Sequence, residues 1–267
     1  MNDASSPTAD PACLQVEHDA RGAVATLRLN RPAQYNALSR NVLDRLHAEI
    51  DALARDERVR VVVVTGAGRA FCAGHDLREM QGLPQAQVAA LFDSCSAMMQ
   101  KLTALPQPVI AAVNGLATAA GCQLVAQCDL AVAVSDARFA VSGVNLGLFC
   151  STPAVPLSRN VSRKRAAEML FTGDFIDAPK ALDWGLVNRV VPGDRLAEAV
   201  AELAATLIAK PREVLALGKA LFYRQLETGT EAAYRDASRT IADNMAKGDA
   251  REGVDAFLGK RAPDWKT

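Results

Sequence analysis

Apolar residues along the chain follow two patterns, one typical of buried strands and one typical of amphipathic helices. The runs 61–65 and 108–113 are apolar almost throughout, as in strands buried on both faces, and 14–16, 24–29 and 129–134 are also predicted strands. After Ser39, which can cap a helix, apolar residues recur at helical spacing: Val42, Leu43, Leu46, Ile50 and Leu53. The pattern predicts an α/β core.

The last third of the chain is almost entirely helical in pattern. Helices are predicted over 163–170, 178–184, 195–209, 213–226, 230–245 and 249–258, and earlier over 87–105 and 121–127. A break near Pro192 and Gly193 separates a core, 13–192, from a helical C-terminal subdomain, 193–267. Residues 1–12, rich in Ser, Ala and Pro, are predicted to form a flexible arm.

Composition excludes several classes of partner. The chain has 267 residues, with 30 Lys and Arg against 30 Asp and Glu and a pI near 6.8. No long-range field would therefore gather nucleic acid or an anionic membrane onto it. No run approaches the roughly 18 to 20 apolar residues of a membrane-spanning helix. The first twelve residues resemble neither a secretory signal nor a transit peptide, so we expect a cytoplasmic protein.

The cysteines and histidines indicate neither a disulfide framework nor a metal site. A chain of this size does not depend on disulfides, and no C-x-x-C pair occurs, so we expect buried reduced thiols at Cys13, Cys72, Cys95, Cys122, Cys128 and Cys150. The histidines at positions 18, 47 and 75 belong to no ligand-spaced cluster, and we predict no metal.

Candidate chemistry lies where two buried strands run into turns of small residues before a helix begins, at 61–77 and 109–123. Small side chains leave backbone N–H groups open to a ligand, so an oxyanion could be held between the turns. The alternative is that Ala and Gly only permit close packing. A nucleotide-binding loop is disfavoured because Phe71 stands where that fingerprint needs glycine, and a serine hydrolase because no G-x-S-x-G elbow occurs.

With their surroundings, these segments resemble the crotonase family, known for enoyl-CoA hydratases and isomerases. The resemblance rests on ordered motifs at 29–38, 70–77, 108–115, 120–124, 128–130, 171–174, 184–187 and 191–192. Within the family, 115–123 and 143–153 look most like the enoyl-CoA hydratase domain-containing protein three group. The resemblance implies a crotonase-like ββα superhelix core with a C-terminal helical subdomain that serves in oligomerisation, as a homotrimer or a dimer of trimers.

The resemblance also implies roles for individual residues. The backbone N–H groups of His75 and Ala120 would hold the thioester carbonyl oxygen as it gains enolate charge. Family hydratases use two glutamates to transfer protons. Those positions hold Gln123 and Gly143, and neither an amide nor a glycine can take up and release a proton near pH 7. Ser151 stands where some relatives have a carboxylate, and it could position a water or a polar substituent. The alternative is that Ser151 or Thr152 caps a helix. The His75 side chain could be a base, a hydrogen-bond donor or a structural group.

The resemblance further implies a site for coenzyme A. In the family, the backbone of two segments holds the adenine and pantetheine, and the matching residues here are Ala33, Gln34, Tyr35, Phe71, Cys72 and Ala73. An aromatic residue and a lysine come from a neighbouring subunit, and these match Phe257 and Lys260. Lys260 could equally be a solvated terminal charge. No tightly bound cofactor is expected, because coenzyme A is part of the substrate. Two functions stay open: an enoyl-CoA hydratase or isomerase-type enzyme of fatty-acid metabolism, or a non-catalytic CoA-ester-binding or scaffold protein.

Overall fold

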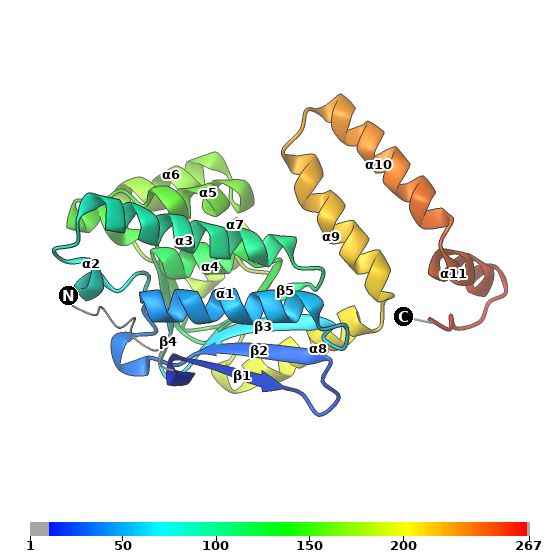
Figure 1. Ribbon diagram of the computed structural model, residues 1–267, viewed down its shortest axis with the longest axis horizontal. Helices are drawn as coiled ribbons and strands as arrows, with labels where there is room; N and C mark the ends of the chain where they lie inside the picture. The colour runs from blue at the N-terminus through cyan, green and yellow to red at the C-terminus, as the bar shows by residue number, and fades with distance from the viewer. Residues whose placement is uncertain (1–10, 266–267) are drawn as a thin grey trace, which may run out of the picture.

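The structure, a computed structural model, describes residues 11–265 and contains two β-sheets (Figure 1). The larger sheet has the order β1-β2-β3-β5-β7-β10, with β1 antiparallel to β2 and all other neighbours parallel. Its strands are β1 (Leu14–His18), β2 (Val24–Leu29), β3 (Val61–Gly66), β5 (Val109–Val113), β7 (Leu130–Val134) and β10 (Arg189–Val191). The strands predicted from the apolar runs are confirmed to within one or two residues at each end.

A smaller sheet, which the sequence did not predict, has the order β4-β6-β8-β9. Its strands are β4 (Ala70–Cys72), β6 (Leu116–Thr118), β8 (Arg138–Ala140) and β9 (Ile176–Asp177). Three long strands, β3, β5 and β7, are each followed directly by one of these short strands and then by a helix or helical turn. This repeated ββα order confirms the crotonase-like fold.

Helices cover both faces of the larger sheet (Figure 1). Alternate strand residues face opposite sides. Val62 and Val64 pack toward α1 (Arg40–Arg55) and α3 (Gln85–Ala104), whereas Val61 and Val63 pack toward α8 (Leu196–Ile208). In α1, the Ser39 hydroxyl accepts a hydrogen bond from the N–H of Val42, and the predicted apolar face is buried. The helices of this part are α1 (Arg40–Arg55), α2 (Leu77–Met80), α3 (Gln85–Ala104), α4 (Ala120–Gln127), α5 (Ser151–Asn160), α6 (Arg163–Thr172), α7 (Ala178–Trp184) and α8 (Leu196–Ile208), with 3-10 turns η1 (Pro11–Cys13), η2 (Pro32–Gln34), η3 (Ser142–Leu146) and η4 (Gly193–Arg195).

The last three helices extend away from the two sheets (Figure 1). They are α9 (Arg212–Leu226), α10 (Thr230–Met245) and α11 (Gly248–Leu258). The buried ammonium of Lys219 fixes α9 to the core, because it donates to the carboxylate of Asp129 at 2.6 Å and to the carbonyl oxygens of Leu102 and Gln107. The hydroxyl of Tyr223 donates to the other oxygen of Asp129 at 2.7 Å. Large apolar side chains remain exposed along these helices: Phe222, Leu226, Tyr234, Ile241, Met245, Phe257 and Leu258.

The structure describes only part of what was predicted for the ends of the chain. The predicted arm, 1–12, lies outside the described residues except for positions 11 and 12, which begin η1. Within the predicted C-terminal subdomain, α8 packs on the larger sheet and the helices from α9 onward extend from it. All six cysteines are buried, as predicted. No helix within residues 11–265 has the length and apolar character needed to cross a membrane.

Candidate functional site

The two small-residue turns lie side by side. A Cβ atom placed on Gly74 would lie 2.9 Å from the Cβ of Ala119 and 3.2 Å from the backbone N of Ala120. The hydroxyl of Thr118 links the two turns, because it donates a 3.0 Å hydrogen bond to the carbonyl oxygen of Ala73. The first turn therefore packs directly on the start of α4, as the sequence argument requires.

Two backbone N–H groups at these turns have no partner in the backbone network of the described residues. Around His75, the N–H of Leu38 donates to Gly74 at 2.7 Å and the N–H of Asp76 donates to Leu38 at 3.1 Å, which holds the turn while leaving the N–H of His75 unused. Ala120 is the first residue of α4, where backbone N–H groups have no partner inside the helix. Neither N–H group therefore has a backbone acceptor among the described residues, and Ala120 itself is buried.

Close packing fixes the start of α4. Ala119 has φ 49°, a region that residues with a side chain rarely adopt, and its N–H donates to the carbonyl oxygen of Ala140 in β8 at 2.9 Å. Such a conformation costs about 1–3 kcal/mol and persists where the surroundings enforce it. A Cβ on Gly121 would lie 1.9 Å from the carbonyl oxygen of Cys72, so only glycine fits. The close-packing alternative is thus correct for Gly121, and the same packing sets the direction of the neighbouring N–H.

A cavity of about 380 Å³ opens at the two turns. Five of the predicted site residues line it together: Ala73, His75, Ala120, Gly143 and Ser151. Apolar side chains from α2, α3 and the segment before α5 form much of the remaining wall: Leu77, Met80, Val88, Phe92, Leu146, Leu148 and Phe149. Sequence reasoning missed these wall residues, and only the apolar positions of the helix predicted over 87–105 hinted at them.

The imidazole of His75, which belongs to the first of the two turns, lines the cavity. The ring packs edge-on against Phe92, with the two ring centroids 4.8 Å apart. The Nε2 atom is buried and has no hydrogen-bond partner among the described residues. Burial lowers the pKa of His75 to about 4, so the ring is neutral near pH 7. A neutral imidazole can donate or accept one hydrogen bond to a ligand.

Gly143, which the sequence resemblance matches to the second glutamate position of the family, has no room for a side chain. A Cβ on Gly143 would lie 2.5 Å from the carbonyl oxygen of Leu148 and 2.7 Å from the Sγ of Cys150. The N–H of Gly143 donates to this Sγ at 3.3 Å. Burial raises the pKa of the Cys150 thiol above its usual value, so the group is protonated at neutral pH. The thiol thus occupies the space into which a side chain at Gly143 would extend.

Gln123 and Ser151 differ in how they meet the cavity. Gln123 lies on α4 with only 4% of its surface exposed; its Oε1 has no partner among the described residues, and the residue is not part of the cavity wall. Ser151 lines the cavity, but the prediction that Ser151 or Thr152 caps α5 is wrong. The helix begins at Ser151. The hydroxyl of Ser151 donates to the carbonyl oxygen of Phe149 at 3.3 Å and does not accept from a helix N–H.

The two predicted CoA segments are joined to each other. The N–H of Ala73 donates to the carbonyl oxygen of Tyr35 at 3.0 Å, and Tyr35 follows Ala33 and Gln34 of η2 in the left-handed region. The side chains of Phe71 and Cys72 are fully buried in β4, so only their backbone could face a ligand. Sequence reasoning missed Arg69, whose guanidinium lies 4.4 Å from the centroid of the Tyr35 ring and donates to its hydroxyl.

Phe257 and Lys260 are not brought to the cavity within one chain. Phe257 is 82% exposed on α11, and Lys260 follows that helix with φ 52°. Figure 1 shows α11 at the opposite end of the molecule from α2, which forms part of the cavity wall. Any contribution of these residues to a site of this kind therefore requires a second copy of the chain.

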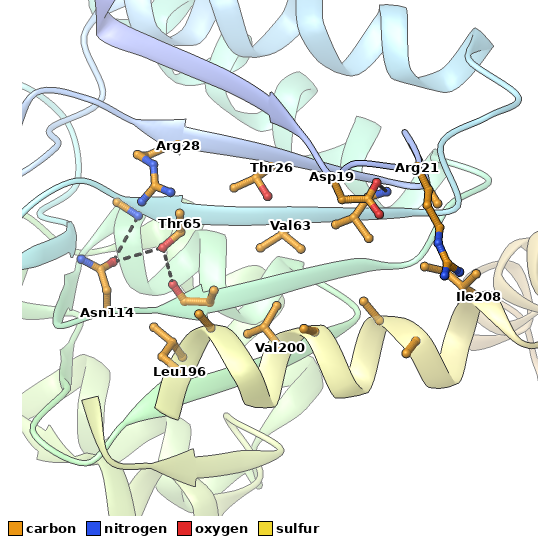
Figure 2. A pocket seen from close by; sticks show the side chains of 18 of the residues that line it. Asp19, Arg21, Thr26, Arg28, Val63, Thr65, Asn114, Leu196, Val200 and Ile208 are labelled. Carbon is orange, nitrogen blue, oxygen red and sulfur yellow. Dashed lines mark hydrogen bonds between the residues drawn. The ribbon is translucent and has the colours of Figure 1, made fainter. Parts of the chain in front are cut away.

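A larger cavity of about 930 Å³ lies elsewhere, between α8 and the face of β2, β3 and β5 (Figure 2). Its walls are mostly apolar, and several of its polar side chains are engaged within the protein. Thr65 donates to the carbonyl oxygen of Ala112 at 2.8 Å, and Arg28 pairs with Glu17 at 3.3 Å. None of the predicted site residues lines it. The smaller cavity, with its two unused N–H groups and its unpartnered imidazole, is the candidate site.

Comparison with known proteins agrees with this geometry. The family model described as enoyl-CoA hydratase/isomerase matches residues 19–267. The chain belongs to this family. A crystal structure of an enoyl-CoA hydratase from Mycobacterium smegmatis superimposes with a TM-score of 0.93 at 55% identity, covering 96% of this chain and 99% of that one. The predicted resemblance to the crotonase family is confirmed.

Curated relatives place the chain within the family. The mitochondrial enoyl-CoA hydratase domain-containing protein 3 of Rattus norvegicus is 45% identical over 243 residues, covering 91% of this chain and 81% of the relative. The 2,3-dehydroadipyl-CoA hydratase of Escherichia coli is 36% identical over 244 residues, covering 91% and 95%. The predicted likeness to the domain-containing protein three group is confirmed, and the chain is an enoyl-CoA hydratase-like protein of the crotonase family.

The predicted cytoplasmic localisation is contradicted. The relatives of that group from rat, mouse, frog, human and zebrafish are all named mitochondrial. The prediction rested on the composition of the first twelve residues, and of these only positions 11 and 12 are described by the structure.

Within residues 11–265, no group of three or more His, Cys, Asp and Glu side chains is arranged to hold a metal ion.

Proposed function

We propose that this protein binds acyl-CoA or enoyl-CoA thioesters and stabilises the thioester enolate, as an enzyme of the hydratase/isomerase type in fatty-acid metabolism. One observation carries the proposal: the unused N–H groups of His75 and Ala120 belong to adjacent turns whose residues line one cavity. A carbonyl oxygen that accepts from both would be stabilised as it gains charge, and each such donor is worth about 2.7–4 kcal/mol.

The coenzyme A portion would extend from the cavity along the joined segments at Ala33, Gln34 and Tyr35 and at Phe71, Cys72 and Ala73. The guanidinium of Arg69, next to the Tyr35 ring, provides a cation on this path. We further propose a homotrimer or a dimer of trimers, in which a neighbouring copy presents Phe257 and Lys260 of α11 to this portion. The exposed apolar side chains of α9 to α11 support this assembly, since an extended arm of this kind buries them only against another chain.

Hydration by two carboxylates is not part of the proposal. Gln123 does not line the cavity, and Gly143 has no room for a side chain. Each missing general acid or base typically lowers a rate by about 10²- to 10⁴-fold, so ordinary hydration should be slow. Enolate stabilisation depends only on the two backbone donors and does not require these carboxylates.

A β-ketoacyl-CoA such as acetoacetyl-CoA tests the proposal, because its enolate forms readily and absorbs ultraviolet light. We expect the protein to lower the pKa of the bound ester by about 2 units or more relative to the free ester, the equivalent of at least one oxyanion donor. The measurement is the enolate absorbance of the bound ester as a function of pH. A bound ester whose pKa equals that of the free ester would contradict enolate stabilisation.

A second candidate function is that of a non-catalytic CoA-ester-binding or scaffold protein. It is favoured by the cavity wall, in which none of the described lining residues is Asp, Glu, Lys or Arg. Hydration and isomerisation assays with short, medium and long enoyl-CoA esters separate the two functions. Measurable binding without turnover of any ester would favour the non-catalytic protein, and turnover of any of them would exclude it.

A further inference from the structure

The C-terminal tail, residues 259–265, runs from the end of α11 back to the junction between α8 and α9 (Figure 1). The indole N–H of Trp265 donates a 3.1 Å hydrogen bond to the carbonyl oxygen of Ala209, the residue that follows α8. The same ring lies against α11, because a Cβ placed on Gly253 would be 3.2 Å from its Cη2 atom. Trp265 therefore connects α11 to the base of α9 and closes the helices α9 to α11 into a loop.

A carboxylate on α11 holds the tail between the helix and Trp265. The guanidinium of Arg261 donates to both oxygens of Glu252, at 2.5 and 2.9 Å, and the N–H of Asp264 donates to one of them at 2.7 Å. A bidentate pair of this kind sets geometry as well as adding energy. The tail is thus fixed at two places, by the carboxylate of Glu252 and by the ring of Trp265.

Lys260 lies in this tail in a backbone conformation that a lysine rarely adopts. Its φ is 52°, and it follows α11 at the left-handed position where glycine is usual. The N–H of Lys260 donates to Phe257 at 3.2 Å and the N–H of Arg261 donates to Ala256 at 3.0 Å, the two bonds that close such a helix end. The ammonium of Lys260 has no partner among the described residues, so no contact of its side chain within them offsets the cost of this conformation.

We propose that Trp265 is a positioning residue for coenzyme A binding, because it fixes the tail that carries Lys260. This inference rests on the proposed function, in which Lys260 of one copy meets the coenzyme A portion bound by a neighbouring copy. A lysine on a free tail would lose the freedom of that tail when it binds a phosphate group, whereas a lysine on a fixed tail has lost it on folding. Trp265 acts through Lys260 and need not touch the ester.

Two esters with the same acyl group test the inference: hexanoyl-CoA, which carries the phosphate groups of its nucleotide, and hexanoyl-pantetheine, which lacks the nucleotide. Calorimetric titration of the full-length protein at pH 7 gives both dissociation constants. Trp265→Ala should weaken binding of hexanoyl-CoA by roughly tenfold, the cost of immobilising one long side chain and its segment. Binding of hexanoyl-pantetheine should stay within about twofold, since Lys260 has no phosphate to meet. Trp265→Phe, which keeps a ring, should recover part of the affinity for hexanoyl-CoA.

The contact can also be disturbed from the side of α11. Gly253→Leu places a side chain against the ring of Trp265 and should weaken hexanoyl-CoA selectively, as Trp265→Ala does. Gly218→Leu in α9 is the matched control, because a Cβ there meets nothing within 4 Å, and it should leave both constants unchanged. Hydrogen exchange should show faster exchange of the α11 amides in Trp265→Ala and Gly253→Leu than in the wild type and Gly218→Leu.

Lys260→Gly separates the role of the side chain from that of the fold. Glycine suits the left-handed position, so the midpoint of thermal unfolding should rise by about 1–4 °C. Affinity for hexanoyl-CoA should nevertheless fall at least as far as in Trp265→Ala. If Trp265 acts through Lys260, adding Trp265→Ala to Lys260→Gly should weaken hexanoyl-CoA by less than about twofold more.

The outcomes separate this inference from the proposed function. Wild-type affinity of folded Trp265→Ala for hexanoyl-CoA overturns the inference, and so does an equal loss of affinity for both esters. A loss that accompanies dissociation of the assembly in sedimentation also overturns it, because Trp265 would then act on assembly and not on Lys260. If the wild type binds neither ester, the proposed function fails as well. Should Trp265→Ala fail to fold, Gly253→Leu decides, and its wild-type affinity for hexanoyl-CoA overturns the inference.

Discussion

Replacing Ala120 with proline removes one proposed donor while keeping the helix that carries it. Proline has no N–H, and its fixed φ near −65° suits the first position of a helix, which Ala120 occupies in α4. The residue before a proline avoids the right-handed helical region, and Ala119, at φ 49° and ψ −119°, lies outside that region. The ring would place a methylene group where the N–H now faces the cavity.

The size of the effect follows from the value of a single donor. One oxyanion donor contributes about 2.7–4 kcal/mol, and one pKa unit corresponds to about 1.4 kcal/mol. Ala120→Pro should therefore raise the pKa of protein-bound acetoacetyl-CoA by about 2 to 3 units over its value in the wild-type complex. Affinity for a saturated acyl-CoA should fall much less, since an uncharged carbonyl oxygen gains less from the donor than an enolate does.

The assay compares the enolate absorbance of the bound ester across a pH series for wild type, Ala120→Pro and Ala120→Gly. The glycine variant is the control, because it keeps the N–H, and its pKa should match that of the wild type within a few tenths. Circular dichroism and thermal unfolding verify that both variants are folded. If folded Ala120→Pro binds the enolate with the wild-type pKa, the N–H of Ala120 is not a donor to the ester, and the reasoning from the two turns is refuted.

Three further predictions concern stability, each measured by urea unfolding. Gly143→Ala should lower the free energy of unfolding by about 1–3 kcal/mol, because the new Cβ overlaps a backbone carbonyl and the Cys150 thiol. The control Gly218→Ala in α9, where a Cβ meets nothing within 4 Å, should raise it by up to about 1 kcal/mol. Equal effects of the two variants would contradict the crowding at Gly143. Lys219→Met should lower the free energy of unfolding by about 3–5 kcal/mol, because it leaves the Asp129 carboxylate and two carbonyl oxygens without their buried ammonium partner. The control Lys247→Met, in an exposed ion pair, should lower it by at most about 1 kcal/mol. A similarly small loss for Lys219→Met would show that other contacts hold α9 on the core. Burial lowers the pKa of His75 to about 4 from its ordinary value of 6.5, so the unfolded chain binds more protons than the folded protein between pH 4 and pH 6.5. The free energy of unfolding should therefore fall by about 3 kcal/mol as the pH drops from 6.5 to 4. If His75→Phe loses stability as steeply as the wild type over this pH range, His75 is not the cause.

The long elements were predictable because their burial pattern repeats over several turns or strand residues. In α1 the five predicted apolar positions are all buried, and Ser39 caps the helix as expected. The second sheet was not predictable in the same way. Its strands span two or three residues each, too short for an alternating pattern to be distinguished from a turn. These short strands nevertheless place the two turns together, since β4 and β6 pair in parallel just before them.

The candidate site was predictable where it depends on local backbone and not where it depends on packing between segments. Strand, small-residue turn and helix start are consecutive in sequence, so His75 and Ala120 could be singled out from motifs. That Gln123 does not line the cavity depends on the rotation of α4, which no local motif specifies. That Ser151 donates to Phe149 rather than capping α5 depends on the path of the preceding segment.

The absence of a carboxylate at Gly143 is a property of the whole segment 142–150 rather than of one position. A side chain at Gly143 meets two groups, and only the thiol of Cys150 could be removed by substitution, because the other is the backbone carbonyl oxygen of Leu148. At position 123, the Oε1 atom of Gln123 is buried and has no partner among the described residues. A glutamate there would carry a buried carboxyl group without a partner, and such burial raises the pKa of a carboxyl group. Substituting glutamates into this chain would therefore place one carboxyl against backbone and hold the other protonated. The two-carboxylate arrangement requires a different path for the segment, whereas the two proposed backbone donors need no side chain, so the proposed enolate stabilisation does not depend on that path.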